Sequence, residues 1–301
     1  MNKAMVACLV MTAFSFDIMV AQEETLVVYS NVPNAEASDQ YELAVRTLET
    51  KGPWLRPFAF VTRCKEGIKG KNHYFPHLSG WSNTFINIEM SGPVEIAIRK
   101  VNGKPIRKAA VHPGRKARSC ILRDGNAYVI IEEPCLIAVD IDGQMDDQDT
   151  GKGYRGPPIH TLTIFANPVI ENRPRPDDPN VKTVRPGEVA PSEGNWKTLY
   201  FMPGVHDIGV GFPVHANKNY YIPGDAMVHG TMSNHGQWND GNNIRIFGYG
   251  VLSGSRIPHP DFASPKPKEA KQHDPIPVSY THLRAPETRE EGVCRLLLAK
   301  Q

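Results

Sequence analysis

Short runs of alternating apolar and polar residues cover much of the chain, and turn-forming residues separate them. Val94 and Ile96, for example, would face one side of a sheet and Glu95 the other, as in a sheet with one buried face. The pattern predicts strands at 83–90, 94–100, 108–111, 120–122, 127–131, 135–141 and 161–165. Strands of this length and spacing, with Asn-Gly and Asp-Gly turns between them, are typical of a β-sandwich.

Three later segments share a different design, in which a triplet of strand-forming residues is followed by a glycine turn. They are 197–204, 219–224 and 242–254. Their strand starts recur roughly every 21 to 24 residues, a period short enough for single coils of a solenoid. We therefore predict an all-β chain with an N-terminal β-sandwich followed by the first coils of a right-handed parallel β-helix.

A helix is predicted only at 38–49, with Ser38 or Asp39 as its cap and Tyr41 and Leu48 on a partial apolar face. A Pro-rich stretch separates the sandwich from the coils, because closely spaced prolines favour extended backbone over a ladder. The expected division is a signal peptide at 1–21, an extension at 22–80, the sandwich at 81–168, a Pro-rich linker at 169–186, the coils at 187–257, a Pro-rich segment at 258–277 and a tail at 278–301.

The first residues have the pattern of a secretory signal peptide. Lys3 precedes the apolar run 4–16, and Ala21 stands at the expected cleavage point before an acidic stretch. The alternative is a buried first strand or helix. Because the run is too short to cross a bilayer, we expect a secreted or extracytoplasmic protein with no membrane span.

The tail has an unusual composition. Segments 278–285 and 293–299 match, in the expected order, the translation of a transposase sequencing adapter, although Pro286 and Glu291-Gly292 depart from it. The alternative is a natural charged tail. We expect the native polypeptide to be interrupted near Pro277, and the remainder is left out of the fold prediction.

Composition narrows the function further. The chain has 301 residues, 26 prolines and 25 glycines, which favours many short strands over long helices. A net charge of +2 is too small to indicate binding to nucleic acid. No motif indicates a cofactor, and we expect a monomer.

Cysteine positions allow one disulfide. Cys8 lies in the signal peptide and Cys294 in the tail, which leaves Cys64, Cys120 and Cys135. In a secreted protein Cys120 and Cys135 could pair across a hairpin that turns at residues 124–126, while Cys64 has no assigned partner. Two buried thiols are the alternative.

Two groups of residues could hold a metal, but neither has the spacing of a known site. Acidic residues gather at Asp140, Asp142, Asp146, Asp147 and Asp149, where a calcium site and a solvated loop are the two interpretations. Histidines lie at His206, His215, His229 and His235, on different coils and without thiolates. We predict no metal site.

The coil region also contains polar and aromatic candidates. Asn239-Asp240-Gly241 has the composition of a turn. The aromatic residues Tyr220, Tyr221, Trp238 and Tyr249 could stack on sugar rings or cap the coil core.

The coil motifs resemble those of known enzymes. Segment 200–206 has the pattern Phe-x-Pro-Gly-x-His, and segment 243–254 has the pattern Asn-Ile-x-Ile-x-Gly-x-Gly-x-x-Ser-Gly. With the sandwich before them, they resemble the secreted dextranases and isopullulanases of glycoside hydrolase family 49. They are also similar to the related polygalacturonases of family 28. The resemblance implies the pectin-lyase-like fold, and it places the catalytic carboxylates on coils beyond residue 254.

The sequence therefore predicts an N-terminal fragment of a glycoside hydrolase that acts on a polysaccharide, an α-glucan. The fragment itself would be inactive, with no catalytic residue, and its substrate-binding residues are unknown. The alternatives are a fragment of a polygalacturonase-like pectin hydrolase and a non-catalytic carbohydrate-binding solenoid.

Overall fold

The structure, a computed structural model, describes residues 25–63, 82–144, 159–234 and 243–256, with the backbone alone at 148–149 and 155–156. The expected signal peptide, the Pro-rich segment 258–277 and the tail lie outside these residues. Within the described residues the chain consists of strands and a single short 3-10 helix, η1 (Gly114–Lys116). The predicted all-β architecture is confirmed.

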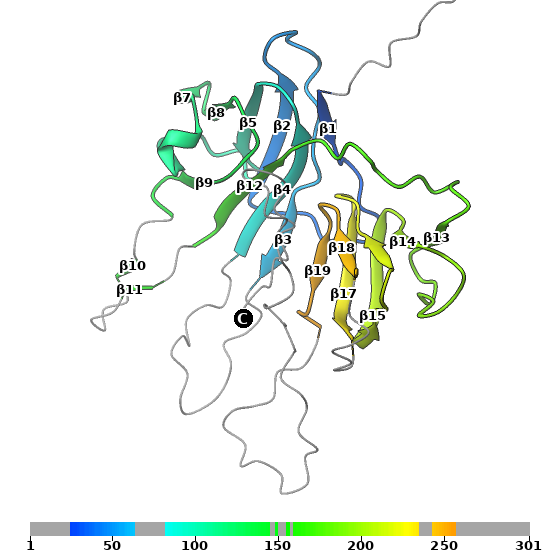
Figure 1. Ribbon diagram of the computed structural model, residues 1–301. Helices are drawn as coiled ribbons and strands as arrows, with labels where there is room; N and C mark the ends of the chain where they lie inside the picture. The colour runs from blue at the N-terminus through cyan, green and yellow to red at the C-terminus, as the bar shows by residue number, and fades with distance from the viewer. Residues whose placement is uncertain are drawn as a thin grey trace, which may run out of the picture.

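The N-terminal part is a sandwich of two sheets (Figure 1). The first sheet contains, in order, β1 (Leu26–Val28), β4 (Ser82–Met90), β12 (Thr161–Asn167), β9 (Cys135–Ile141) and β6 (Ala109–His112), and β3 (Phe60–Arg63) also pairs with β4. The second sheet contains, in order, β2 (Tyr41–Thr47), β5 (Val94–Lys100), β8 (Asn126–Ile131) and β7 (Ser119–Arg123). Strand β4 is parallel to β12, and the other pairs are antiparallel.

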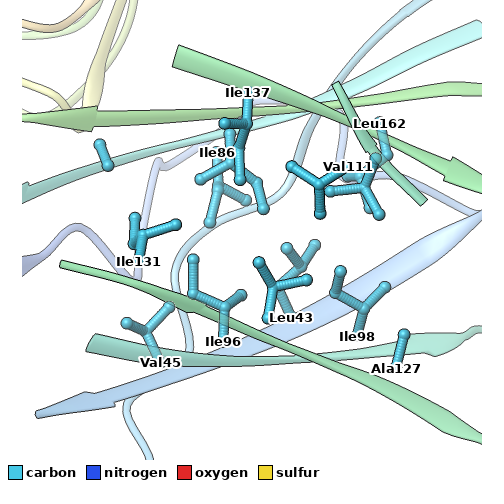
Figure 2. Close-up of a cluster of buried hydrophobic side chains, with 14 of the residues drawn as sticks. Leu43, Val45, Ile86, Ile96, Ile98, Val111, Ala127, Ile131, Ile137 and Leu162 are labelled. Carbon is cyan, nitrogen blue, oxygen red and sulfur yellow. The ribbon is translucent and has the colours of Figure 1, made fainter. Parts of the chain in front are cut away.

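The sandwich core lies between the two sheets. Figure 2 shows Leu43 and Ile96 of the second sheet facing Ile86 and Leu162 of the first. The alternation predicted for residues 94–99 is present, because Val94, Ile96 and Ile98 are fully buried in the core whereas Arg99 is exposed. Apolar burial of this kind contributes about 25 cal/mol per Å² of apolar surface.

The helix predicted at 38–49 is wrong, because this segment forms the edge strand β2. Tyr41, Leu43 and Val45 are buried, and β2 pairs antiparallel with β5 from Tyr41 to Thr47. Apolar residues in this segment satisfy a period of two as well as a helical period, and packing against β5 decides between them. The segment expected as an extension therefore supplies strands to the sandwich, including β1 and β3 on one edge of β4.

The second part is formed by stacked parallel coils. One sheet contains β13 (Val181–Val184), β14 (Thr198–Phe201), β16 (Asn219–Tyr221) and β18 (Arg245–Phe247), and the other contains β15 (Gly204–Pro213), β17 (Ala226–Ser233) and β19 (Val251–Ser253). All of these pairs are parallel. A separate antiparallel pair joins β10 (Gln148–Asp149) to β11 (Arg155–Gly156). The predicted coils are confirmed, and their first strand, β13, lies within the segment expected as a linker.

Glycines allow the coils to turn tightly. At Gly248, φ is +110° and an added Cβ would lie 2.0 Å from the carbonyl oxygen of Ile222, so a side chain is excluded twice, by conformation and by space. The coil core beneath these turns includes Leu199, Phe201, Tyr220 and Val228.

The outer face of the first sandwich sheet packs on the coils. A third apolar cluster joins Phe60, Phe85 and Phe165 of that sheet to Met227 and Val251 of the coils, and Figure 1 shows β19 next to β3. The Phe60 and Phe85 rings stack with centroids 5.0 Å apart. We call this contact, together with Tyr29 and Gly224, the junction.

The junction predicts a strong effect of adding one methyl group. At Gly224 a Cβ would lie 2.2 Å from a ring carbon of Tyr29, so Gly224→Ala should lower the free energy of unfolding by about 1–3 kcal/mol through overpacking. Urea denaturation measures this change. In the control, Gly92→Ala, an added Cβ meets nothing within 4 Å. Equal midpoints for the two variants would contradict the packing.

Candidate functional site

The proposed disulfide partners lie on different sheets. Cys120 of β7 is opposite Val129 of β8, whereas Cys135 of β9 is opposite Ala166 of β12. No disulfide joins the two cysteines, and both are partly buried against the sandwich core. The predicted hairpin exists, but the chain crosses to the other sheet after β8, which separates the second cysteine from the first. Cys64 lies outside the described residues.

The acidic loop has a structural role at Asp142. This carboxylate forms an ion pair with Lys100 and accepts the backbone N–H groups of Arg107 and Lys108, each at 2.8 Å. Partial burial alone would raise the pKa of Asp142, but these hydrogen bonds outweigh it and lower the pKa. Asp140 is buried, and the side chains of Asp146, Asp147 and Asp149 lie outside the described residues.

The histidines do not converge. His206 faces the coil core, where its ring stacks edge-on against Phe201 and its Nε2 donates to the Met202 carbonyl at 2.7 Å. His206 pairs with Val228, which is in the coil core, whereas the next residue, Asp207, pairs with His229. Because successive residues of a strand point to opposite faces, His229 is on the outer face of the same sheet. Among the described residues, no three His, Cys, Asp or Glu side chains are placed to hold a metal. His235 lies outside that part of the chain.

Two of the coil aromatics are buried and therefore closed to a ligand. Tyr220 points into the coil core and is fully buried. Tyr221 is also fully buried, on the outer face, between the Tyr200 and Phe247 rings at centroid distances of 5.0 Å each. The Tyr249 hydroxyl donates to the Pro168 carbonyl at 2.9 Å. Sugar stacking is therefore wrong for Tyr220 and Tyr221, whereas for the half-buried Tyr249 it stays a prediction. Trp238 and Asn239-Asp240-Gly241 lie outside the described residues.

A buried ion pair joins the connector to the sandwich beside these rings. Glu89 is fully buried, and both of its oxygens accept hydrogen bonds from Arg173 Nη2 at 2.9 Å. The backbone N–H of Ile170 donates to Glu89 at 2.9 Å, and the Tyr29 hydroxyl donates to it as well. Burial and the neighbouring carboxylate raise the pKa of Tyr29 above its ordinary value. This cluster explains why a Pro-rich connector holds a defined path.

Polar residues on the outer side of the coils form a row that the sequence analysis missed, in which Asp207 and Arg256 are exposed while His229 and Ser253 are buried. Register places Asp207 opposite His229 and His229 opposite Ser253, on three successive coils. Parallel neighbours are about 4.8 Å apart, so the three side chains line up on the outer face. Arg256 Nη1 donates to Asp207 Oδ2 at 3.1 Å and completes the set. We call these four residues the polar row.

The polar row offers both donors and acceptors. The backbone N–H of Gly209 and the guanidinium of Arg256 lower the pKa of Asp207, so the carboxylate is ionised. Burial, with Arg256 beside it, lowers the pKa of His229, which is 8% exposed and whose Nδ1 makes no hydrogen bond. The groups of the row that solvent reaches are the Asp207 carboxylate and the Arg256 guanidinium, an acceptor and a donor that sugar hydroxyls can use.

The row lacks the geometry of an acid and base pair. Burial raises the pKa of Asp225, as a general acid requires. The residue opposite Asp207 on the next coil is His229, and Asp225 lies four residues before His229 in the sequence. At 3.3 Å per residue this is about 13 Å, whereas an inverting pair needs about 6.5–9.5 Å. These two aspartates therefore do not form a glycosidase pair.

One signal in the sequence could have revealed part of the row. Asp207 and Ser253 each follow a turn glycine, Gly204 and Gly250, by three residues. Aligning the coils on these glycines would have placed both side chains at the same position. His229 follows Ala226 instead, so only the strand register brings it into the row.

Comparison with known proteins shows a shared fold. Neither a protein-family model nor a curated protein sequence matches the chain. Among solved structures, "Dex49A from Penicillium minioluteum" matches with a TM-score of 0.55 and 18% sequence identity, over 78% of this chain and 49% of that chain. The chain thus spans about half the length of that protein. In the part that the structure describes, no helix has the length and apolar character to cross a membrane.

The buried ion pair predicts a large effect of removing Arg173. Arg173→Ala leaves the fully buried Glu89 without its charge partner, which should cost about 3–5 kcal/mol of unfolding free energy. Adding Glu89→Gln should recover part of the loss. The control is Arg99→Ala, because the Arg99–Glu42 pair has side chains 54% and 43% exposed and should contribute at most about 1 kcal/mol. Similar losses for the two arginines, by urea denaturation, would be inconsistent with this assignment.

The buried histidines predict a pH dependence of stability. Burial lowers the pKa of His206 and His229, so their contribution is complete above the unfolded value of about 6.5. It is lost as the pH falls toward the folded value, because the unfolded chain then binds more protons.

We expect the urea concentration at the denaturation midpoint to decrease as the pH is lowered from about 7.5 to about 5.5. The variant His229→Gln should show a smaller decrease. Burial raises the pKa of Asp225, which acts in the opposite direction, so the comparison between variants isolates the histidine. His112→Gln, at an exposed position, is the control. An unchanged fall in His229→Gln would rule out the buried histidine as a cause.

Proposed function

We propose that this chain is the N-terminal part of a secreted glycoside hydrolase that acts on a polysaccharide, an α-glucan such as dextran. The observation that carries the proposal is the combination of a sandwich and parallel coils in one chain, an arrangement shared with Dex49A over 78% of this chain. The coil motifs that resemble family 49 enzymes support the same class. Fold likeness at 18% identity supports the architecture, and the substrate rests on the motifs.

The shape of the coils suits a polymeric substrate. Stacked coils present an extended surface on which several units of a chain can lie. The polar row runs across three of these coils, so its hydrogen-bonding groups follow the stacking direction. We assign to its exposed members, Asp207 and Arg256, a role in contacting sugar hydroxyls, without a role in bond cleavage.

Cleavage requires groups that the described coils do not bring together. One carboxylic acid must protonate the leaving oxygen while a carboxylate activates water from the opposite side. Asp207 of β15 and Asp225, which directly precedes β17, are too far apart to provide this pair. We therefore propose that the catalytic carboxylates belong to further coils, and that the chain as written hydrolyses no glycan.

The test combines a DNA experiment with an activity assay. Amplifying the source DNA across the codon for Pro277 should reveal a reading frame that continues into more coils with paired aspartates. The longer protein should release reducing sugar from dextran, and the 301-residue chain should release none. The proposal fails if the source DNA encodes residues 278–301 followed by a stop codon. It fails on substrate if the longer protein cleaves polygalacturonate and not dextran.

A further inference from the structure

The second sandwich sheet has an outer face that points away from the coils. Its inner face packs on the sandwich core, and the first sheet lies between that core and the coils. The outer face is therefore on the side of the sandwich that the coils do not cover. Two rows of paired residues cross it, Ala44–Ala97–Tyr128–Ile121 and Arg46–Glu95–Ile130–Ser119.

Trp54 lies at the edge of this face and is held in place by a charged pair. Leu55 exchanges both backbone hydrogen bonds with Val45, at 2.8 and 2.7 Å, so Trp54 stands opposite Arg46 on the outer side of β2. The Arg46 guanidinium lies 4.3 Å from the indole centroid. Arg46 in turn donates from Nε and Nη2 to Glu95 Oε2 at 2.8 and 2.5 Å.

Burial indicates which side of the indole is covered. Glu95 is 8% exposed although it points outward from the sheet, while Trp54 is 37% exposed. The Arg46 side chain, at 23% exposed, is therefore sandwiched between the sheet and the indole. The Trp54 ring thus lies against a cation while more than a third of the residue stays exposed.

Tyr128 continues the aromatic surface toward the centre of the sheet. Its ring centroid is 6.3 Å from that of Trp54, with the planes tilted by 58°. The positions beside Tyr128 on the two intervening strands are Ala44 and Ala97, whose methyl groups leave room above the sheet for both rings. The Arg123 guanidinium lies 4.1 Å from the Tyr128 centroid. We call Trp54 and Tyr128 the aromatic platform.

The charges around the platform select an uncharged ligand. Arg46 is paired with Glu95 and Arg99 with Glu42, so these four charges cancel within the face. A further cation, Arg123, lies on the Tyr128 ring, but a single guanidinium is not the cluster of cations that phosphate or carboxylate polymers require. Paired charges still present donors and acceptors at their edges, which neutral hydroxyl groups can use.

We propose that the aromatic platform is a glycan-binding site for a neutral sugar chain. The apolar C–H face of a pyranose ring lies on the exposed part of Trp54, Tyr128 contacts the adjacent unit, and Glu42 and Arg99 hydrogen-bond sugar hydroxyls. The site is separate from the coils, so it would hold a polymer without cleaving it. The choice of α-glucan as the first probe rests on the proposed function, whereas the neutral class rests on the platform alone.

The experiment is native gel electrophoresis of the full chain in gels that contain dextran, pullulan or polygalacturonate. Dextran or pullulan should retard the chain, and Trp54→Ala should weaken the affinity about tenfold or more. Trp54→Phe keeps a flat ring and should retain most of the retardation. The control is Leu136→Ala, which removes a side chain with the same 37% exposure from the other sheet. Near-UV circular dichroism verifies that each variant folds.

Three results would overturn the proposal: no retardation by either neutral glucan, equal retardation of Trp54→Ala and the original chain, or retardation by polygalacturonate alone. Because binding is read without hydrolysis, an inactive longer protein leaves this result intact. Conversely, a failed platform leaves the proposed hydrolase function to be judged by its own assay.

Discussion

The junction between the sandwich and the first coils is the contact on which the rest of the structure depends. Parallel sheets require cover on both faces, and a few coils alone expose their outer face and their first edge. Here Phe60, Phe85 and Phe165 cover the outer apolar row of the coils. The Glu89–Arg173 ion pair holds the connector beside this contact. The sandwich therefore covers an outer face of the first coils.

This constraint decides which side chains remain available for a ligand. Tyr221 is on an outer face of the coils, but the sandwich and connector bury it completely. The polar row lies further along the other coil sheet, two residues beyond the Met227 that packs in the junction. The junction buries the aromatic surface nearest the sandwich, and the exposed polar groups of the row, Asp207 and Arg256, lie beyond that contact. Open aromatic surface is found instead on the opposite sheet of the sandwich, at Trp54.

Two separate surfaces with different chemistry follow from this arrangement. The polar row combines an ionised Asp207 with a neutral, largely buried His229, which favours directional hydrogen bonds. The aromatic platform combines a flat apolar ring with self-paired charges, which favours stacking. A polymer that contacts both would be bound at two sites of one chain, and linked sites bind more tightly than either alone when the geometry allows both to be occupied.

The sequence by itself determined the period of the strands, the positions of the turns and the coil corners. Alternation at 94–99 and glycine at position 248 are local requirements of a pleated strand and of a left-handed turn, so they can be read without the fold. Tertiary structure decided what each strand lies against. It made a strand of residues 41–47, because β5 offered an edge to pair with, and it placed Cys135 on the sheet opposite Cys120. It also aligned Asp207, His229 and Ser253, and it buried Tyr220 and Tyr221. Neither result can be read from a local pattern, because register and sheet packing depend on residues far apart in the chain.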